Sequence, residues 1–218
     1  MPNIRHDQRI IALSGPKGSG KDTLAKALFK QNDNYPYSFR RAPFAGTANP
    51  PTGVKGVCSI MFGYTEEQTE NPVLKETPTE AWPFLPPRVP MMDIANTLRD
   101  MYGGDVHVQA WERRRRAAHQ WLAHVITDHR FPEELEYLKE VGALIIYIQR
   151  DEAEAALQQK IAQGDKMAQN VSESHYAVIK QNADYVLENN GGVAEAANQL
   201  VSIVRKTFGH WSLWGHAV

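Results

Sequence analysis

A glycine-rich segment near the start of the chain has residue types and spacing that suit phosphate binding. It reads Gly15-Pro16-Lys17-Gly18-Ser19-Gly20-Lys21, which fits the pattern G-x-x-x-x-G-K. Glycines let the backbone wrap closely around phosphate groups with its N–H groups pointing inward, and the lysine reaches the outer phosphates. The segment predicts a site for the phosphates of ATP, formed by Gly15, Pro16, Lys17, Gly18, Ser19, Gly20, Lys21, Asp22 and Thr23.

The residue after the loop lysine departs from the usual pattern. Ser or Thr normally follows and offers its hydroxyl to Mg²⁺, whereas this chain has Asp22 and then Thr23. Asp22 could bind or orient hydrated Mg²⁺, or face the phosphate acceptor, while Thr23 could supply the hydroxyl. The sequence predicts Mg²⁺ as a cofactor, with Asp22, Thr23 and Asp128 as its candidate ligands, directly or through water.

A second candidate cation follows an apolar run at 124–127. Asp128 and Arg130 come directly after this run, and ligands of open α/β sheets bind at the carboxyl ends of strands. A guanidinium can bind phosphate in bidentate fashion, and a carboxylate two residues earlier could hold Mg²⁺ through water or orient the guanidinium. The alternatives are a helix cap at Asp128 and a surface salt bridge at Arg130. The candidate catalytic residues are Lys21, Asp22, Asp128 and Arg130.

Apolar runs alternate with helical patterns along much of the chain. The pattern predicts strands at 9–13, 124–127, 143–148 and 183–187, and helices at 21–30, 151–163 and 193–207, with another from Pro132. Strands that alternate with helices form a parallel sheet, so the expected fold class is α/β. Residues 31–87 are irregular and rich in Pro and Gly, which indicates an insertion that carries binding residues. A helix start is expected at Thr65.

Composition limits the classes of function. The 218 residues contain 24 Lys and Arg against 25 Asp and Glu, which argues against a general nucleic-acid coat protein. One cysteine, Cys58, excludes an intramolecular disulfide framework and suits a reducing compartment. No apolar stretch has the length of a membrane span, so a soluble protein of the cytoplasm, or of the host cytoplasm if viral, is the expectation.

Several segments, taken together with the loop, resemble the deoxynucleoside monophosphate kinases of bacteriophages. The phosphate loop of that family also reads Ser-Gly-Lys-Asp-Thr, so Asp22 follows its pattern. The strongest match after the loop is residues 125–134, which is similar to Ile-x-Asp-x-Arg-Phe-x-x-Glu. Weaker matches lie in order along most of the chain, at 44–45, 62–68, 87–108, 172–173 and 183–191. Residues 46–56 and 69–87, where the acceptor nucleotide should be recognised, depart from the family.

The resemblance implies a three-layer P-loop kinase fold with a central parallel sheet and two insertions. It implies one domain over 1–218, with a core at about 8–32, 120–150 and 180–208, an acceptor-nucleotide insertion at about 36–118 and a lid at about 151–172. The implied reaction moves the γ-phosphoryl of Mg-ATP to a deoxynucleoside monophosphate for viral DNA synthesis, with dGMP or dTMP favoured. Related kinases are often homodimers.

Further candidate contacts lie in the insertion and near the lid. By resemblance Arg88 would hold the acceptor phosphate, and Arg150, after the 143–148 run, would contact ATP. Phe44 and Trp111 could stack on the acceptor base or could pack in the core. Base edges could be read by Asn96 or by Gln109. The predicted acceptor contacts are Phe44, Arg88, Asn96, Gln109, Trp111 and Arg130.

Three other functions fit parts of the pattern. Gly-Lys-Asp-Thr is also similar to the loop of animal-type phosphomevalonate kinases, another class of small-molecule P-loop kinase. The run Arg113 to Arg116 would suit a nucleic-acid-stimulated P-loop ATPase, although most of these arginines are expected to be solvated and no direct nucleic-acid partner is predicted. A nucleotide-binding regulator without turnover is the third, with Asp22 as its indication.

Overall fold

The computed structural model describes residues 9–31, 38–118, 122–164 and 175–208. These residues form two compact units, one containing those described within 1–42 and 119–218, and the other containing residues 43–118. Within the described residues no helix is long and apolar enough to span a membrane.

A parallel sheet of five strands forms the centre of the first unit. Its order is β2-β3-β1-β4-β5, and every neighbouring pair is parallel, as in Ile11 opposite both Val125 and Leu144. All five strands therefore end at the same edge of the sheet. The strands are β1 (Ile10–Ser14), β2 (Ser38–Arg41), β3 (Leu122–Ile126), β4 (Leu144–Gln149) and β5 (Tyr185–Glu188).

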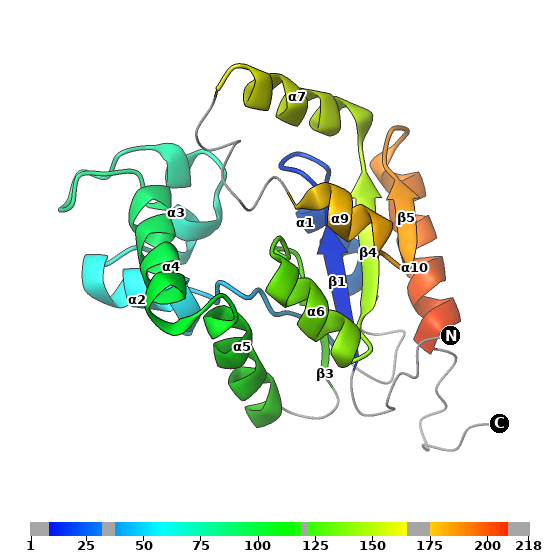
Figure 1. The fold of residues 1–218 in the computed structure, drawn as a ribbon, viewed down its shortest axis with the longest axis horizontal. Helices are drawn as coiled ribbons and strands as arrows, with labels where there is room; N and C mark the ends of the chain where they lie inside the picture. Colours follow the sequence, from blue (N-terminus) through cyan, green and yellow to red (C-terminus); the bar gives the residue numbers. More distant parts are fainter. Residues whose placement is uncertain (1–8, 32–37, 119–121, 165–174, 209–218) are drawn as a thin grey trace. The chain divides into compact units, whose positions relative to one another are not determined.

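Helices cover both faces of this sheet. In Figure 1, α1 and α10 lie behind the sheet and α6 and α9 lie in front of it, so the unit has three layers. The strands β1 and β4 are buried on both sides, which explains why they are continuous apolar runs in the sequence. The helices of this unit are α1 (Lys21–Phe29), α6 (Pro132–Glu140), α7 (Asp151–Ala162), α9 (Tyr176–Gln181) and α10 (Val193–Phe208).

The main hydrophobic core lies between the sheet and the α1 and α10 layer. Residues at helical spacing on these two helices supply one side of the core, and inward residues of the strands supply the other. The core includes Leu24, Leu28, Leu200 and Val204 from the helices and Ile11, Leu13, Val125, Leu144, Ile146 and Leu187 from the strands. This packing holds the ends of the strands, where the candidate site lies, on a rigid base.

The second unit is helical, with a small core of its own. Val54, Cys58 and Tyr64 form this core, and burial raises the pKa of the Cys58 thiol to about 11, so the thiol stays protonated. The side chains of Thr65 and Gln68 cap the start of the second of its helices reciprocally. The unit contains α2 (Gly53–Phe62), α3 (Glu66–Glu70), the short 3₁₀ helix η2 (Leu74–Glu76), α4 (Arg88–Tyr102) and α5 (Val106–Ala117).

The structure confirms the predicted α/β class and the parallel sheet. The expected strands and helices are present with ends that differ by a few residues, because hydrophobic periodicity locates an element better than its ends. The strand at 38–41 belongs to the first unit, so the second unit begins later than the expected insertion. The end of the expected lid (165–172), the Ser172-Glu173 match and the Trp211–Val218 tail lie outside the described residues.

Candidate active site

The glycine-rich loop connects β1 to α1 at the carboxyl edge of the sheet. Gly15 has φ 133°, and a Cβ there would lie 2.5 Å from the Ile148 carbonyl oxygen, so only glycine fits between the two strands. Lys17 and Gly18 are exposed at the tip of the loop, whereas Ser19 is buried. The loop therefore follows a buried strand and leads into a helix N-terminus, which is the arrangement that phosphate binding requires.

Lys21 is folded back over the loop. Its Nζ donates to the carbonyl oxygens of Gly15 at 2.5 Å and Pro16 at 2.8 Å, and lies 3.4 Å from the Ser19 hydroxyl. The side chain is buried, and oxygen atoms surround its ammonium group. This places a cation at the centre of the loop, where it can exchange carbonyl partners for phosphate oxygens.

Asp22 lies where the ends of two neighbouring strands approach α1. The Thr127 hydroxyl, just beyond β3, donates to Asp22 Oδ1 at 2.8 Å, and the Arg41 guanidinium at the end of β2 lies 3.9 Å from the same oxygen. The Asp22 side chain is nevertheless 68% exposed, so its other oxygen can face a ligand. Neither Arg41 nor Thr127 was among the predicted site residues, although both come directly at strand ends.

The segment after β3 is held from two sides. Ser14, at the end of β1, donates its hydroxyl to the His129 carbonyl at 3.2 Å. The buried Glu134 carboxylate accepts the backbone N–H groups of Arg130 at 2.7 Å and Phe131 at 3.0 Å. The backbone that carries Asp128 and Arg130, both partly buried, is therefore fixed at the edge that carries the loop.

The polar groups described so far are hydrogen-bonded, but the ring nitrogens of His129 are not. Its ring is fully buried, and neither ring nitrogen has a hydrogen-bond partner among the described residues. Burial lowers the pKa of His129 to about 3, because the charged imidazolium is disfavoured away from water. His129 is therefore neutral at physiological pH, and its backbone carbonyl is the group that contacts β1.

The ends of β4 and β5 complete this edge. Arg150 follows β4, and its guanidinium pairs with Glu152 at 2.7 Å in an exposed position. Asn189 follows β5, is buried, and donates its side-chain N–H to the Ser19 carbonyl of the phosphate loop at 2.8 Å. A Cβ on Gly20 would lie 2.4 Å from that Asn189 nitrogen, which explains the glycine.

Asn190, the next residue, contacts the start of α7. The Asn190 side-chain oxygen Oδ1 accepts the backbone N–H of Asp151, the first residue of α7, at 2.9 Å, and the Asn190 side-chain NH₂ group donates to the Asp151 carboxylate at 3.0 Å. Two adjacent asparagines therefore contact the phosphate loop and the start of α7. A motif search would not find this pair, because the signal is only an Asn-Asn-Gly-Gly turn after a short strand.

The oxygen groups at this edge fit the requirements of Mg²⁺. Mg²⁺ in phosphotransfer sites is bound by one or two carboxylates, with substrate phosphates and water completing its shell. The exposed Asp22 carboxylate, pinned by Thr127, is a hard oxygen donor of this kind, and Thr23 is exposed one residue further along α1. No group of three or more His, Cys, Asp or Glu suited to a metal occurs among the described residues, so a closed protein cage is absent there.

The predicted acceptor contacts of the second unit have other partners in this structure. Phe44 and Trp111 are buried and pack against each other with ring centroids 5.5 Å apart. Arg88 Nε pairs with Glu76 at 2.5 Å, and the Gln109 amide donates to Asp105 at 3.0 Å. Asn96 is exposed on α4. The geometry inside this unit brings Phe44 and Trp111 together, whereas Arg88 and Gln109 are paired with acidic residues of the same unit.

The arginine run on α5 is largely engaged inside the same unit. Arg115 and Arg116 both pair with Glu112, at 2.5 Å and 2.8 Å. Arg114 donates to the carbonyl oxygens of Pro43 at 3.4 Å and Phe44 at 3.2 Å. These contacts reduce the positive charge that the run presents to solvent.

The five-stranded parallel sheet, its order and the strand–loop–helix unit form the α/β P-loop arrangement that the sequence predicted. No family model matches the chain. The chain is 29% identical over 207 residues to the "Putative deoxynucleotide monophosphate kinase" of Acanthamoeba polyphaga mimivirus, covering 89% of this chain and 95% of that protein. This similarity confirms the resemblance to deoxynucleoside monophosphate kinases that the motifs indicated.

A solved structure is also similar. Shikimate kinase from Acinetobacter baumannii, in complex with shikimate, matches with a TM-score of 0.45 and 15% sequence identity. The match covers 92% of this chain and 94% of that one.

Proposed function

We propose that the protein is a deoxynucleoside monophosphate kinase, which transfers the γ-phosphoryl group of Mg-ATP to a dNMP and releases a dNDP and ADP. The observation that carries the proposal is that the carboxyl ends of all five parallel strands lie at the edge where the phosphate loop lies. These ends supply Arg41, Thr127 to Arg130, Arg150 and Asn189, and the start of α1 supplies Lys21. The similarity to a viral protein of that name supports the same reaction.

The proposed roles follow from the charge that phosphoryl transfer brings together. An acceptor phosphate oxygen bonds to the γ-phosphorus of ATP while the bond to the β–γ bridging oxygen breaks, and catalysis consists of positioning and charge stabilisation. Lys21 would bind the β- and γ-phosphates, and Arg130 would bind the transferred or the acceptor phosphate. Arg150 would contact ATP from the end of β4, beside the loop strand.

The metal would be held by Asp22, with Thr23 and Asp128 as further oxygen donors, directly or through water. When bound, Mg²⁺ neutralises charge on the phosphate oxygens. Thr127 orients the Asp22 carboxylate for this role through its 2.8 Å hydrogen bond. Arg88 would bind the acceptor phosphate after exchange of its Glu76 partner, because a guanidinium binds either anion in the same geometry.

A product assay tests the proposal. The full chain is incubated with Mg-ATP and each of the four dNMPs, and the nucleotides are separated by chromatography. We expect ADP and a dNDP in equal amounts, with dGMP or dTMP giving the highest rate. Lys21→Met should lower turnover by at least about 100-fold, because the loop loses its cation, while circular dichroism stays unchanged. ADP without any dNDP would contradict a kinase and favour an ATPase, and full activity of Lys21→Met would contradict the role of the loop.

A further inference from the structure

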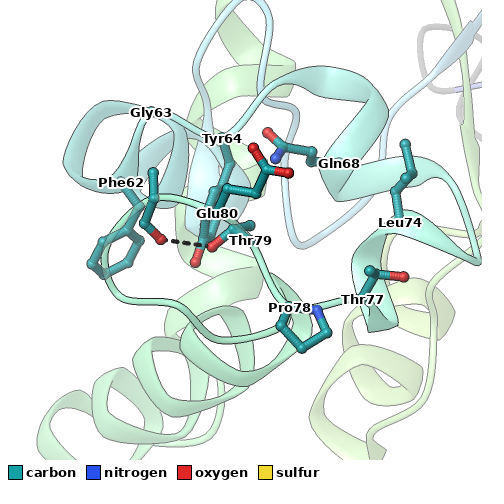
Figure 2. Close-up of a pocket in the computed structure, with 10 residues that line it drawn as sticks. Phe62, Gly63, Tyr64, Gln68, Leu74, Thr77, Pro78, Thr79 and Glu80 are labelled. Carbon is teal, nitrogen blue, oxygen red and sulfur yellow. Dashed lines mark hydrogen bonds between the residues drawn. The ribbon is translucent and has the colours of Figure 1, made fainter.

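A pocket of about 310 Å³ lies wholly inside the second unit. Residues 62–64, Gln68, Leu74 and residues 77–81 line it, from the end of α2 across α3 to the segment after η2. Figure 2 shows these side chains around the opening, with Tyr64 and Glu80 at its centre. None of the residues assigned above lines this pocket. Its lining joins residues 62–64 and Gln68, from the 62–68 match to the family, with Leu74 and residues 77–81, which lie where the sequence departs from the family pattern.

One side of the pocket is aromatic. The rings of Phe62 and Tyr64 lie 5.4 Å apart between centroids, and Phe62 is also 5.4 Å from Trp82, which is 64% exposed. Tyr64 itself is buried, and burial is the main cause that raises the pKa of its hydroxyl, so the ring stays neutral. Proteins commonly bind unpaired bases by stacking them on such rings.

The polar groups of the pocket divide into two kinds. The hydroxyls of Thr77 and Thr79 donate to the backbone carbonyls of Val73 and Ala81, each at 2.9 Å, and the second of these bonds is the dashed line in Figure 2. They are therefore already engaged within the chain.

Two further groups are available to a ligand besides the buried Tyr64 hydroxyl, which has no hydrogen-bond partner among the described residues. The Gln68 side-chain oxygen accepts the Thr65 backbone N–H at 2.9 Å, which fixes the amide and leaves its NH₂ group to donate. Among the residues that the structure describes, the Glu80 carboxylate has no hydrogen-bond or ion-pair partner. The pocket thus combines an aromatic wall with one oriented donor group and one acceptor group.

We propose that this pocket binds the base of the acceptor nucleotide and selects guanine. The proposal rests on the kinase function proposed above and names its acceptor. The Watson–Crick edge of guanine carries the O6 acceptor beside two donors, N1–H and the 2-amino group. Gln68 would donate to O6, and the Glu80 carboxylate would accept N1–H and the 2-amino group together.

The other bases fit this pair of groups less well. Adenine has a donor where guanine has O6 and lacks N1–H. Cytosine and thymine both place their O2 acceptor where guanine has its amino group, so O2 would face the Glu80 carboxylate. Gln68 is partly buried, so leaving its NH₂ group without an acceptor costs binding free energy, whereas for the exposed Glu80 the cost of a wrong base comes from two acceptors in contact. Guanine alone satisfies both groups.

The test uses Glu80→Gln and a matched control, Glu67→Gln, which removes an exposed carboxylate of α3 that does not line the pocket. We expect the wild-type chain to phosphorylate dGMP with the highest kcat/KM. Glu80→Gln should lower kcat/KM for dGMP by about 10- to 100-fold, the discrimination that a bidentate base contact provides. Its rates with dTMP and dCMP should stay the same or rise. Glu67→Gln should behave as the wild type.

A second acceptor isolates the contact to the 2-amino group. dIMP has the same edge as dGMP without this amino group, so the wild type should use dIMP less well. In Glu80→Gln the difference between dGMP and dIMP should shrink, because the partner of the amino group is changed. An equal dGMP-to-dIMP ratio in the two proteins, or a wild-type preference for a pyrimidine, would overturn the proposal.

Calorimetric titration of the full chain with dGMP separates this proposal from the kinase proposal, because it needs no turnover. Loss of dGMP binding in Glu80→Gln and not in Glu67→Gln supports the pocket even if no dNDP forms. If dNDPs form and the base preference is unchanged in Glu80→Gln, the kinase stands and the guanine pocket is wrong. Gln68 is a less suitable target, because its side chain also caps α3.

Discussion

In the sheet unit, polar groups of the candidate site are held by other residues of that unit, whereas two of the polar side chains that line the pocket of the helical unit, Gln68 and Glu80, are available to a ligand. Lys21 and Asp22 are each bonded within the sheet unit, and Asn189 holds the loop backbone. In the helical unit, Glu80 has no partner among the described residues, and Gln68 has a donor group remaining.

This difference matches two different tasks. Phosphoryl transfer benefits from cations and dipoles that are already oriented, because no reorganisation is then needed at the moment of reaction. Choice of a base depends on groups whose hydrogen bonds are satisfied only by the correct ligand. We therefore expect changes at the sheet edge to affect all acceptors equally and changes in the pocket to alter the choice of acceptor.

Among changes at the sheet edge, Asn189→Ala should have a larger effect than Thr127→Val or His129→Phe. It removes the hydrogen bond to the Ser19 carbonyl and leaves that loop group without its partner, a loss of about 1–3 kcal/mol. We expect the KM for ATP to rise by about 10- to 100-fold, by the same factor with dGMP and dTMP. Steady-state kinetics with a coupled ADP assay measure both.

Asn190→Ala is the matched control, because it removes only the exposed contacts to Asp151. It should change the KM for ATP by no more than a few-fold. If Asn189→Ala altered KM for one acceptor alone, the assignment of this edge to a task common to all acceptors would be wrong.

Thr127→Val should have a smaller effect. The substitution keeps the shape of the side chain and removes the hydroxyl that orients Asp22. A charge-assisted hydrogen bond of this kind contributes about 1.5–3 kcal/mol, and the exposure of Asp22 to solvent reduces that contribution. We expect kcat to fall by about 10-fold and the Mg²⁺ concentration for half-maximal rate to rise. Thr127→Ser, which keeps the hydroxyl, should restore both. Equal kinetics for the Val and Ser variants would exclude a positioning role.

His129→Phe tests the exception at the sheet edge and should have the smallest effect at neutral pH. The unfolded chain binds a proton at His129 below its ordinary pKa of 6.5, whereas the folded chain does so only below about 3. The unfolded state therefore holds more protons between pH 3 and 6.5, so this group makes stability fall as the pH falls, by at most about 1.4 kcal/mol per pH unit.

Denaturant unfolding at pH 7, 6, 5 and 4 measures this dependence. We expect the free energy of unfolding of His129→Phe to decline less steeply below pH 6.5 than that of the wild type. Parallel curves for the two proteins would mean that His129 titrates normally and that its ring is not enclosed as described.

The fold could be predicted to a large extent from local pattern. β1 and β4 are continuous apolar runs, and a strand buried on both faces can hardly have any other composition. The Thr65 and Gln68 cap was visible as a helix start because a capping box is a contact between residues three apart. Strand order was not visible in the same way, because pairing of β1 with both β3 and β4 depends on contacts more than a hundred residues apart.

The candidate site likewise has one part that the sequence predicts and another that only the folded chain brings together. The loop from Gly15 to Lys21 is contiguous, so its chemistry can be read directly from residue types and spacing. Arg41, Thr127 and Asn189 were missed as partners of the loop helix and the loop, because each is a common residue at the end of a strand. Only the sheet brings these three ends together.

The sequence by itself determined a phosphate loop between a strand and a helix, an α/β parallel fold, and a resemblance to deoxynucleoside monophosphate kinases, because each rests on short-range spacing or on hydrophobic periodicity. The tertiary structure decided which groups hold that loop and that Phe44 and Trp111 pack together. It also decided that Gln68 and Glu80 share a pocket. These contacts join residues that are distant in the chain or lie in irregular segments, where no period links a residue type to its neighbours in space.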